Sequence, residues 1–175
     1  LKGMKLRAGG PVAGAAMRAL GVAPVGMPIP AVAENISKGV LDGTAVDWNV
    51  MYSFRIDEVA KNHYMQLFST VPIGMLMTKK RFAELPPKAQ ELLKKHSGHA
   101  VDSLFVRVTT EIQDQWLAKT RVTPGHTIVY PDAADTAAYQ KIMDGVIEQW
   151  AGSDDRRQNI LKTVKAELEK LRAGN

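Results

Sequence analysis

The chain has 175 residues, 45% of them hydrophobic, with 23 Lys and Arg against 18 Asp and Glu, a formal net charge of +5 and no cysteine. This length is typical of about one globular domain with room to bury a core. Without cysteine the chain cannot build disulfide scaffolds, zinc knuckles, iron–sulfur clusters or thiol nucleophiles. No apolar run approaches the roughly 20 residues of a membrane-spanning helix. Because the chain begins at Leu1 without an export signal, we expect a further segment upstream.

Basic side chains near the C-terminus alternate with acidic ones instead of forming a stripe of one sign. This alternation covers Lys162, Lys165, Glu167, Glu169 and Lys170. A nucleic-acid-binding surface would concentrate positive charge on one face, whereas mixed charges indicate a solvated helix face. The sequence therefore predicts no nucleic acid partner.

Short apolar runs, Gly and Pro punctuation and helical periodicity alternate along the chain, which is the pattern of βαβ units. Strands are predicted at Met4–Arg7, Ala23–Met27, Thr44–Trp48, Tyr64–Phe68, Pro72–Met77 and His126–Tyr130. Helices follow the first three strands, one long helix runs from Pro86 to about Thr120, and two more helices close the chain. The pattern favours an α/β fold with a mostly parallel sheet flanked by helices. The long helix, about 45 Å at 1.5 Å per residue, exceeds what a compact sheet needs and is expected to cross between lobes.

Arg7 ends the first predicted strand, directly before a Gly9-Gly10-Pro11 turn that opens a helix. Ligands of open α/β sheets bind beyond the carboxyl ends of the strands. A guanidinium there can hold a carboxylate through two charge-assisted bonds, and the free N–H groups of the first helical turn favour the same negative charge. The sequence therefore predicts an anion site at Arg7. Pairing of Arg7 with an internal Asp is an equally weighted interpretation.

Apolar side chains expected at the same edge of the sheet include Trp48, Val46, Ile29 and Met27. Together they could wall an apolar pocket beside the anion site. Packing of Trp48 into a core or a helix interface is the more common role for such a residue.

The sequence supplies no candidate for catalysis or for a metal site. Nucleotide-binding glycine patterns and a nucleophile elbow are absent. His96 and His99 lack further ligands nearby, and His63 and His126 have no partner that the sequence can assign. We therefore expect no catalytic residues, no metal and no cofactor.

Several runs along the chain resemble the periplasmic solute-binding proteins of TRAP transporters. They are Leu1–Arg7, Leu20–Met27 and Ser37–Gly43, followed by Tyr52–Phe54 and Lys79–Pro86, in the order and spacing of that family. The resemblance implies a periplasmic-binding-protein-like α/β fold of class II type, a periplasmic location, and capture of an organic acid for delivery to membrane permease subunits.

In that family the Arg closing the Gly-x-Lys-x-Arg strand binds the ligand carboxylate, and Arg7 occupies that position. The family's Asn, which contacts polar ligands, corresponds to Val46, and Trp48 follows closely. Because a site lined by carbon cannot satisfy hydroxyl groups, the resemblance implies an aromatic or small hydrophobic monocarboxylate. Arg7 would anchor the acid, while Trp48, Val46, Ile29 and Phe68 shape the remainder of the site.

Members of the family are longer and have two lobes, so the resemblance implies that this chain corresponds to their C-terminal portion. It places residues 1–71 in lobe two, residues 72–112 in a slice of lobe one with the long helix, and residues 113–175 back in lobe two. The missing N-terminal half is then an expected partner. A rival hypothesis is a doubly wound α/β enzyme that orients an anionic substrate with Arg7, and it requires a catalytic acid or base beside the anion.

Overall fold

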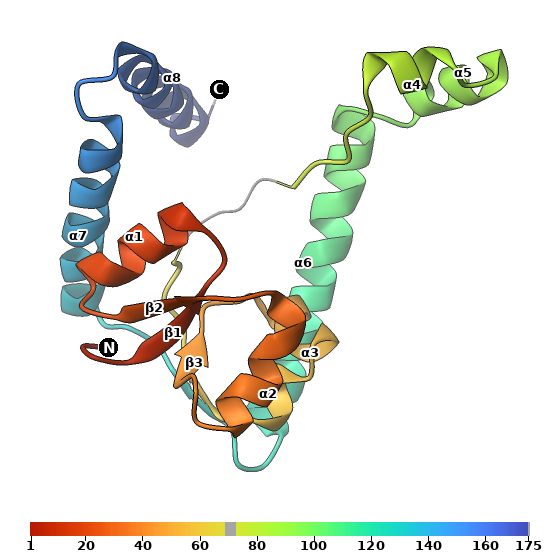
Figure 1. Cartoon of the computed structure of the whole chain (residues 1–175). Coiled ribbons are helices and arrows are strands. Elements are labelled where there is room, and N and C mark those ends of the chain that lie inside the picture. The colour runs from red at the N-terminus through yellow and green to blue at the C-terminus, as the bar shows by residue number, and fades with distance from the viewer. Residues whose placement is uncertain (69–72, 175) are drawn as a thin grey trace. The chain divides into compact units, whose positions relative to one another are not determined.

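The computed structural model describes residues 1–68 and 73–174 (Figure 1). Contacts within the chain divide it into two compact units. Unit 1 comprises Leu1–Thr44 and Tyr130–Asn175, and unit 2 comprises Ala45–Val129. Among the described residues each unit contains one small parallel sheet flanked by helices. The predicted α/β class with parallel strand pairing is therefore confirmed.

Unit 1 is built around strand β1 (Lys5–Ala8), which lies between β2 (Ala23–Gly26) and β3 (Gly43–Thr44). All pairs are parallel, and Arg7 on the central strand is in register with Val25 on one side and Thr44 on the other. The helical elements of unit 1 are α1 (Pro11–Ala19), η1 (Ile29–Ala31), α2 (Val32–Ser37), α7 (Ala133–Ala151) and α8 (Asp155–Arg172).

Helix α1 starts where the sequence predicts, because Pro11 occupies the first helical turn, where its missing N–H is not needed. Helix α7 packs against α1. The side chains of Met17, Val32 and Leu41 are almost completely buried. All three lie in unit 1 and belong to its buried core.

Unit 2 pairs β4 (Asn62–Tyr64) with β5 (Thr127–Val129) in parallel. Its helical elements are α3 (Trp48–Ser53), η2 (Ile56–Glu58), α4 (Lys79–Ala83), α5 (Pro87–Lys95) and α6 (His99–Val122). Helix α3 packs on α6, where Tyr52 and Trp116 stack with ring centroids 4.0 Å apart. The Tyr52 hydroxyl also lies 2.9 Å from Oγ1 of the buried Thr120.

The predicted strand Thr44–Trp48 is wrong beyond its first residue. Strand β3 ends at Thr44, and Trp48 begins helix α3. The cause is local, because Asp47 is the N-cap of α3 and its carboxylate accepts a hydrogen bond from the Val50 N–H at 2.8 Å. Helix α3 is short, because the chain turns at Arg55, whose φ of 56° is left-handed, before the 3-10 helix η2.

Three other predictions of elements need correction. The strand predicted at Tyr64–Phe68 lies earlier, at β4. Residues 73–77 of the strand predicted at Pro72–Met77 form no strand, and residue 72 lies outside the described residues. The single helix predicted from Pro86 to about Thr120 is interrupted between α5 and α6 at Gly98, whose φ of 71° no α-helix can accommodate. The other three predicted strands are confirmed within one residue at each end: Met4–Arg7 as β1, Ala23–Met27 as β2 and His126–Tyr130 as β5.

Large apolar side chains remain exposed on the helices of both units. In unit 2 they include Leu104, Phe105 and Val108 on α6, and in unit 1 Ile160, Val164 and Leu168 on α8. Val108 follows Leu104 and Phe105 by four and three residues, and the three residues on α8 are four apart, so each set forms a stripe along one face of its helix. Within the described ranges, no helix combines the length and the apolar character that crossing a membrane requires.

Candidate functional site

The Arg7 side chain projects from the carboxyl end of β1 and is held by backbone groups. Its Nε–H donates a hydrogen bond of 3.1 Å to the carbonyl oxygen of Met27, just beyond β2. The guanidinium also lies against Gly9, since a β-carbon on Gly9 would come within 3.2 Å of Nη1 and 3.4 Å of Cζ. These contacts orient the guanidinium while leaving its two terminal nitrogens to bind something else.

No carboxylate pairs with Arg7 in the part of the chain that the structure describes. The alternative interpretation, in which an internal Asp neutralises Arg7, therefore finds no support there. Two residues separate β1 from α1, and the N-cap Gly10 has no side chain to cap the helix. The N–H groups of the first turn of α1 and the half-buried Arg7 are both suited to an anion.

Ile29 belongs to the same unit as Arg7 and lies two residues after Met27, at the start of η1. It is half-buried and apolar. Unit 1 therefore contains the predicted anchor, Arg7, and one of the predicted apolar side chains, which follows the carboxyl end of β2.

The other predicted site residues, Val46, Trp48 and Phe68, belong to unit 2 and are half-buried. Trp48 donates its backbone N–H to Gln113 Oε1 at 2.8 Å, and its ring lies 5.1 Å from the ring of His63. Trp48 thus has a packing role within unit 2. A pocket that combines these three residues with Arg7 stays a prediction.

Unit 2 also contains a hydrogen-bonded histidine pair whose partnership the sequence analysis missed. His63 Nε2 lies 2.8 Å from His126 Nδ1, and the two rings stack at a 5.1 Å centroid distance. The Lys61 ammonium lies 3.2 Å from His126 Nε2 and also donates to the Asp57 carbonyl oxygen at 2.7 Å. An ammonium can only donate, so His126 Nε2 must accept and His126 Nδ1–H must donate to His63.

This chain of hydrogen bonds requires both imidazoles to be neutral, because protonating either acceptor nitrogen breaks one link. Burial lowers the pKa of His63 below its usual 6.5, and the neighbouring His126 and Lys61 lower it further. Burial, followed by the charge of Lys61, likewise lowers the pKa of His126. Unit 2 therefore favours neutral histidines. Among the described residues no group of three or more His, Asp or Glu side chains could hold a metal ion.

Thr44 was not predicted as a site residue. Its hydroxyl oxygen is buried and has no hydrogen-bond partner among the described residues, and Thr44 lies beside Arg7 in the sheet. That Thr44 is paired with Arg7 became apparent only once the strand order was known. Lys61, His63 and His126 could be brought together only by pairing β4 with β5. No local motif signals either arrangement.

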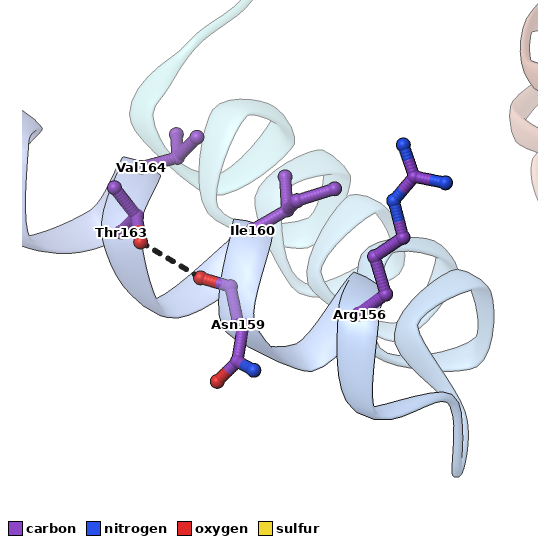
Figure 2. A pocket seen from close by; sticks show the side chains of 5 residues that line it. All are labelled: Arg156, Asn159, Ile160, Thr163 and Val164. Carbon is purple, nitrogen blue, oxygen red and sulfur yellow. Dashed lines mark hydrogen bonds between the residues drawn. The ribbon is translucent and has the colours of Figure 1, made fainter.

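A surface hollow of about 580 Å³ lies along helix α8 and is lined by Arg156, Asn159, Ile160, Thr163 and Val164. Figure 2 shows these five side chains on successive turns of the one helix, with the Thr163 hydroxyl donating to the Asn159 carbonyl oxygen at 2.9 Å. Side chains from a single helix cannot enclose a small molecule on several sides. The hollow is therefore part of the exposed stripe of α8 rather than a ligand site.

Residues 1–153 match the family model of bacterial extracellular solute-binding protein, family 7, also called DctP. Helix α8 lies beyond the matched residues. The resemblance stated from the sequence motifs is thereby confirmed.

Solved structures with the same fold include three TRAP solute-binding proteins. One, from an unidentified marine metagenome microbe, is described as specific for aromatic acid ligands and holds metahydroxyphenylacetate. Its sequence is 28% identical and the TM-score is 0.83, and the match covers 97% of this chain and 56% of the marine protein. A protein from Rhodoferax ferrireducens T118 with copurified benzoate is 24% identical with a TM-score of 0.82, over 97% and 55%. A protein from Xanthobacter autotrophicus Py2 with β-D-galacturonate is 23% identical with a TM-score of 0.81, over 95% and 54%.

These likenesses confirm the periplasmic-binding-protein-like α/β fold. The chain spans just over half the length of each of the three proteins. The matched family and the three structures are solute-binding proteins rather than enzymes.

Proposed function

Because the chain belongs to the bacterial extracellular solute-binding protein family 7, we propose that it supplies the carboxylate-binding part of a TRAP solute-binding protein. The observation that carries the proposal is the Arg7 guanidinium, which is oriented by the Met27 carbonyl and has no acidic partner among the described residues. Such a group at the carboxyl end of a parallel strand suits a bidentate carboxylate. Binding needs no chemical change in the acid.

The ligand we propose is an aromatic or small hydrophobic monocarboxylate. Val46, Trp48, Ile29 and Phe68 supply apolar and aromatic surface that cannot hydrogen-bond sugar hydroxyls. The 28% identical marine protein, with its aromatic acid ligand, supports this choice. Galacturonate, the ligand of the protein from Xanthobacter autotrophicus Py2, shares only its carboxylate group with such acids. Arg7 is therefore the residue that both classes of ligand would need.

The proposed role is to capture the acid in the periplasm and to deliver it to the membrane permease subunits of the transporter. We further propose that residues 1–71 and 113–175 belong to lobe two and that residues 72–112 form a slice of lobe one. Unit 1 is likewise built from two separate stretches of the chain, which supports a lobe of this kind, although these stretches end at Thr44 and resume at Tyr130 rather than at the proposed bounds.

A partner corresponding to the N-terminal half of the longer family members would cover apolar surface that this chain leaves exposed. Leu104 and Phe105 on α6 are each 50% exposed, and Leu168 on α8 is 42% exposed. Complete burial of a fully exposed side chain of this size contributes about 1.5–3 kcal/mol, so covering the exposed half of each of these would contribute about 0.7–1.5 kcal/mol. Because solute-binding proteins close two lobes over their ligand, we expect the 175-residue chain alone to bind weakly.

The test is a titration of the ¹⁵N-labelled 175-residue chain with benzoate, followed by NMR. We expect weak binding, with shifts of the Arg7 Nε–H signal and of backbone amides at Gly9 and Gly10. Arg7→Gln should weaken binding at least tenfold, since charge-assisted bonds are worth about 1.5–3 kcal/mol. Arg18→Gln, the same change of charge on the exposed C-terminal end of α1, is the matched control.

Two results would contradict the proposal. One is unchanged benzoate binding in Arg7→Gln, and the other is an equal loss of binding in the Arg18→Gln control. Micromolar or tighter binding by the 175-residue chain alone would refute the expectation that the second lobe is needed.

A further inference from the structure

Thr44 has a buried hydroxyl group for which the described residues provide no hydrogen-bond partner. Its Oγ1 is one of two such side-chain atoms in that part of the chain, the other being Gln66 Oε1. Buried polar atoms in folded proteins are nearly always paired, because an unpaired hydroxyl loses its hydration without compensation. Thr44 closes strand β3 and is the register partner of Arg7 on β1.

The alternation of side chains along the strands places Thr44 and Arg7 on the same face of the sheet. On the opposite face, a β-carbon on Gly43 would lie 3.2 Å from Leu6 Cδ2, and one on Gly14 of α1 would lie 3.9 Å from Ala8 Cβ. Leu6, Ala8 and Gly43 thus share the face toward α1. Neighbouring residues of a strand point to opposite faces. Arg7, which lies between Leu6 and Ala8, and Thr44, which follows Gly43, therefore share the other face.

Paired residues on adjacent strands bring their side chains within contact distance, because the strands are about 4.8 Å apart. The Arg7 Nε is already bound to the Met27 carbonyl, so the terminal nitrogens of its guanidinium are those that remain for an acid. A carboxylate bound there by two N–H groups still has further lone pairs to satisfy. Thr44, on the adjacent strand and the same face as Arg7, has a hydroxyl without a partner among the described residues.

We propose that Thr44 is a second carboxylate ligand, which donates its hydroxyl hydrogen to the acid held by Arg7. This inference rests on the proposed function and assigns a specificity-determining residue to the same site. Threonine has a single side-chain torsion that positions its hydroxyl, so directing the O–H toward the bound acid orders little else. A hydroxyl that pairs only when the ligand is present would favour the acid over uncharged analogues of the same shape.

The experiment compares benzoate with benzamide, which has the same ring and a similar shape but no charge. Thr44→Val removes the hydroxyl at nearly constant volume, and Thr44→Ser keeps it. We expect Thr44→Val to weaken benzoate binding about tenfold in NMR titrations of the full 175-residue chain. It should change benzamide binding less, and Thr44→Ser should retain benzoate binding within about threefold.

Thermal unfolding of the ligand-free variants gives a second, independent readout. Because valine removes a buried unpaired group, Thr44→Val should melt at or above the temperature of the wild-type chain. Should valine prevent folding, Thr44→Ala provides the same deletion. A Thr44→Val chain that melts well below both the wild type and Thr44→Ser would show that the hydroxyl is paired within the protein, and would overturn the inference.

The Thr44 and Arg7 variants together distinguish failure of this inference from failure of the proposed function. Wild-type benzoate affinity in Thr44→Val, with binding lost in Arg7→Gln, would overturn the role of Thr44 and leave the function of Arg7 standing. Wild-type affinity in both variants, or no benzoate binding by the wild-type chain, would overturn the proposed function and this inference with it.

Discussion

The hydrogen-bonded chain from Lys61 through His126 to His63 should make the stability of unit 2 depend on pH. In the folded chain the pKa of each histidine is lowered from 6.5, first by burial and then by positive neighbours. The unfolded chain therefore binds protons more readily than the folded chain as pH falls below about 6.5. The stabilisation by neutral histidines is complete above that pH and is lost as pH falls toward the lowered pKa values.

The magnitude follows from one histidine–histidine hydrogen bond of 2.8 Å in a partly solvated setting. Such a bond contributes about 1 kcal/mol at most, reduced by its exposure to water, so we expect a loss of about 0.5–1 kcal/mol between pH 8 and pH 5. For a chain of this length that corresponds to a drop in Tm of about 1–4 °C. Asp57, the one nearby acid that raises these pKa values, opposes the effect only weakly.

The assay has two parts. NMR titration of the imidazole Cε1–H signals measures the pKa of His63 and His126 directly, and thermal unfolding at pH 8 and pH 5 measures the stability difference. His126→Gln should shrink the pH-dependent part of Tm, whereas His96→Gln, at the exposed end of α5, should leave it unchanged. A His63 pKa at or above 6.5, or the same pH dependence of Tm in wild type and His126→Gln, would refute the reasoning.

Two further predictions concern contacts within unit 2. Asp47→Ala should lower the free energy of unfolding by about 1–2 kcal/mol in urea titrations, because it removes the cap on Val50 and a 2.9 Å bond from Gln113. A loss no greater than that of Asp114→Ala, an exposed change on α6, would contradict the capping role. Thr120→Val should lower the free energy of unfolding by about 1 kcal/mol, because it removes the hydrogen bond with the Tyr52 hydroxyl. A double-mutant cycle with Tyr52→Phe should show coupling between the two changes. Purely additive losses would mean that the two hydroxyls do not interact.

Local sequence signals predicted the elements of unit 1 well because Gly and Pro decide where its strands stop. The Gly9-Gly10-Pro11 turn ends β1 and begins α1, and helices connect the three parallel strands, as the βαβ pattern predicts. Arg7 could be proposed as an anchor from its place at a strand end and from the family motif, and that role stays a prediction. The hydrogen bond from Arg7 to the Met27 carbonyl could not be predicted, because it depends on the path of the chain after β2.

The wrong or missing predictions have either local or tertiary causes. Trp48 follows apolar residues that favour a strand, but the capping carboxylate of Asp47 starts a helix there. Gly98 divides a segment whose apolar periodicity is otherwise continuous. The histidine pair is formed by residues 63 positions apart, and no short-range pattern reveals such pairing.

The central claim is that Arg7 binds the carboxylate of an organic acid. A crystal structure of the 175-residue chain soaked with concentrated benzoate tests it most directly. We predict the carboxylate oxygens at about 2.7–2.9 Å from the terminal nitrogens of Arg7, with the Nε–Met27 bond retained. Benzoate bound elsewhere with Arg7 untouched, or Arg7 paired with a carboxylate of the chain itself, would contradict the account.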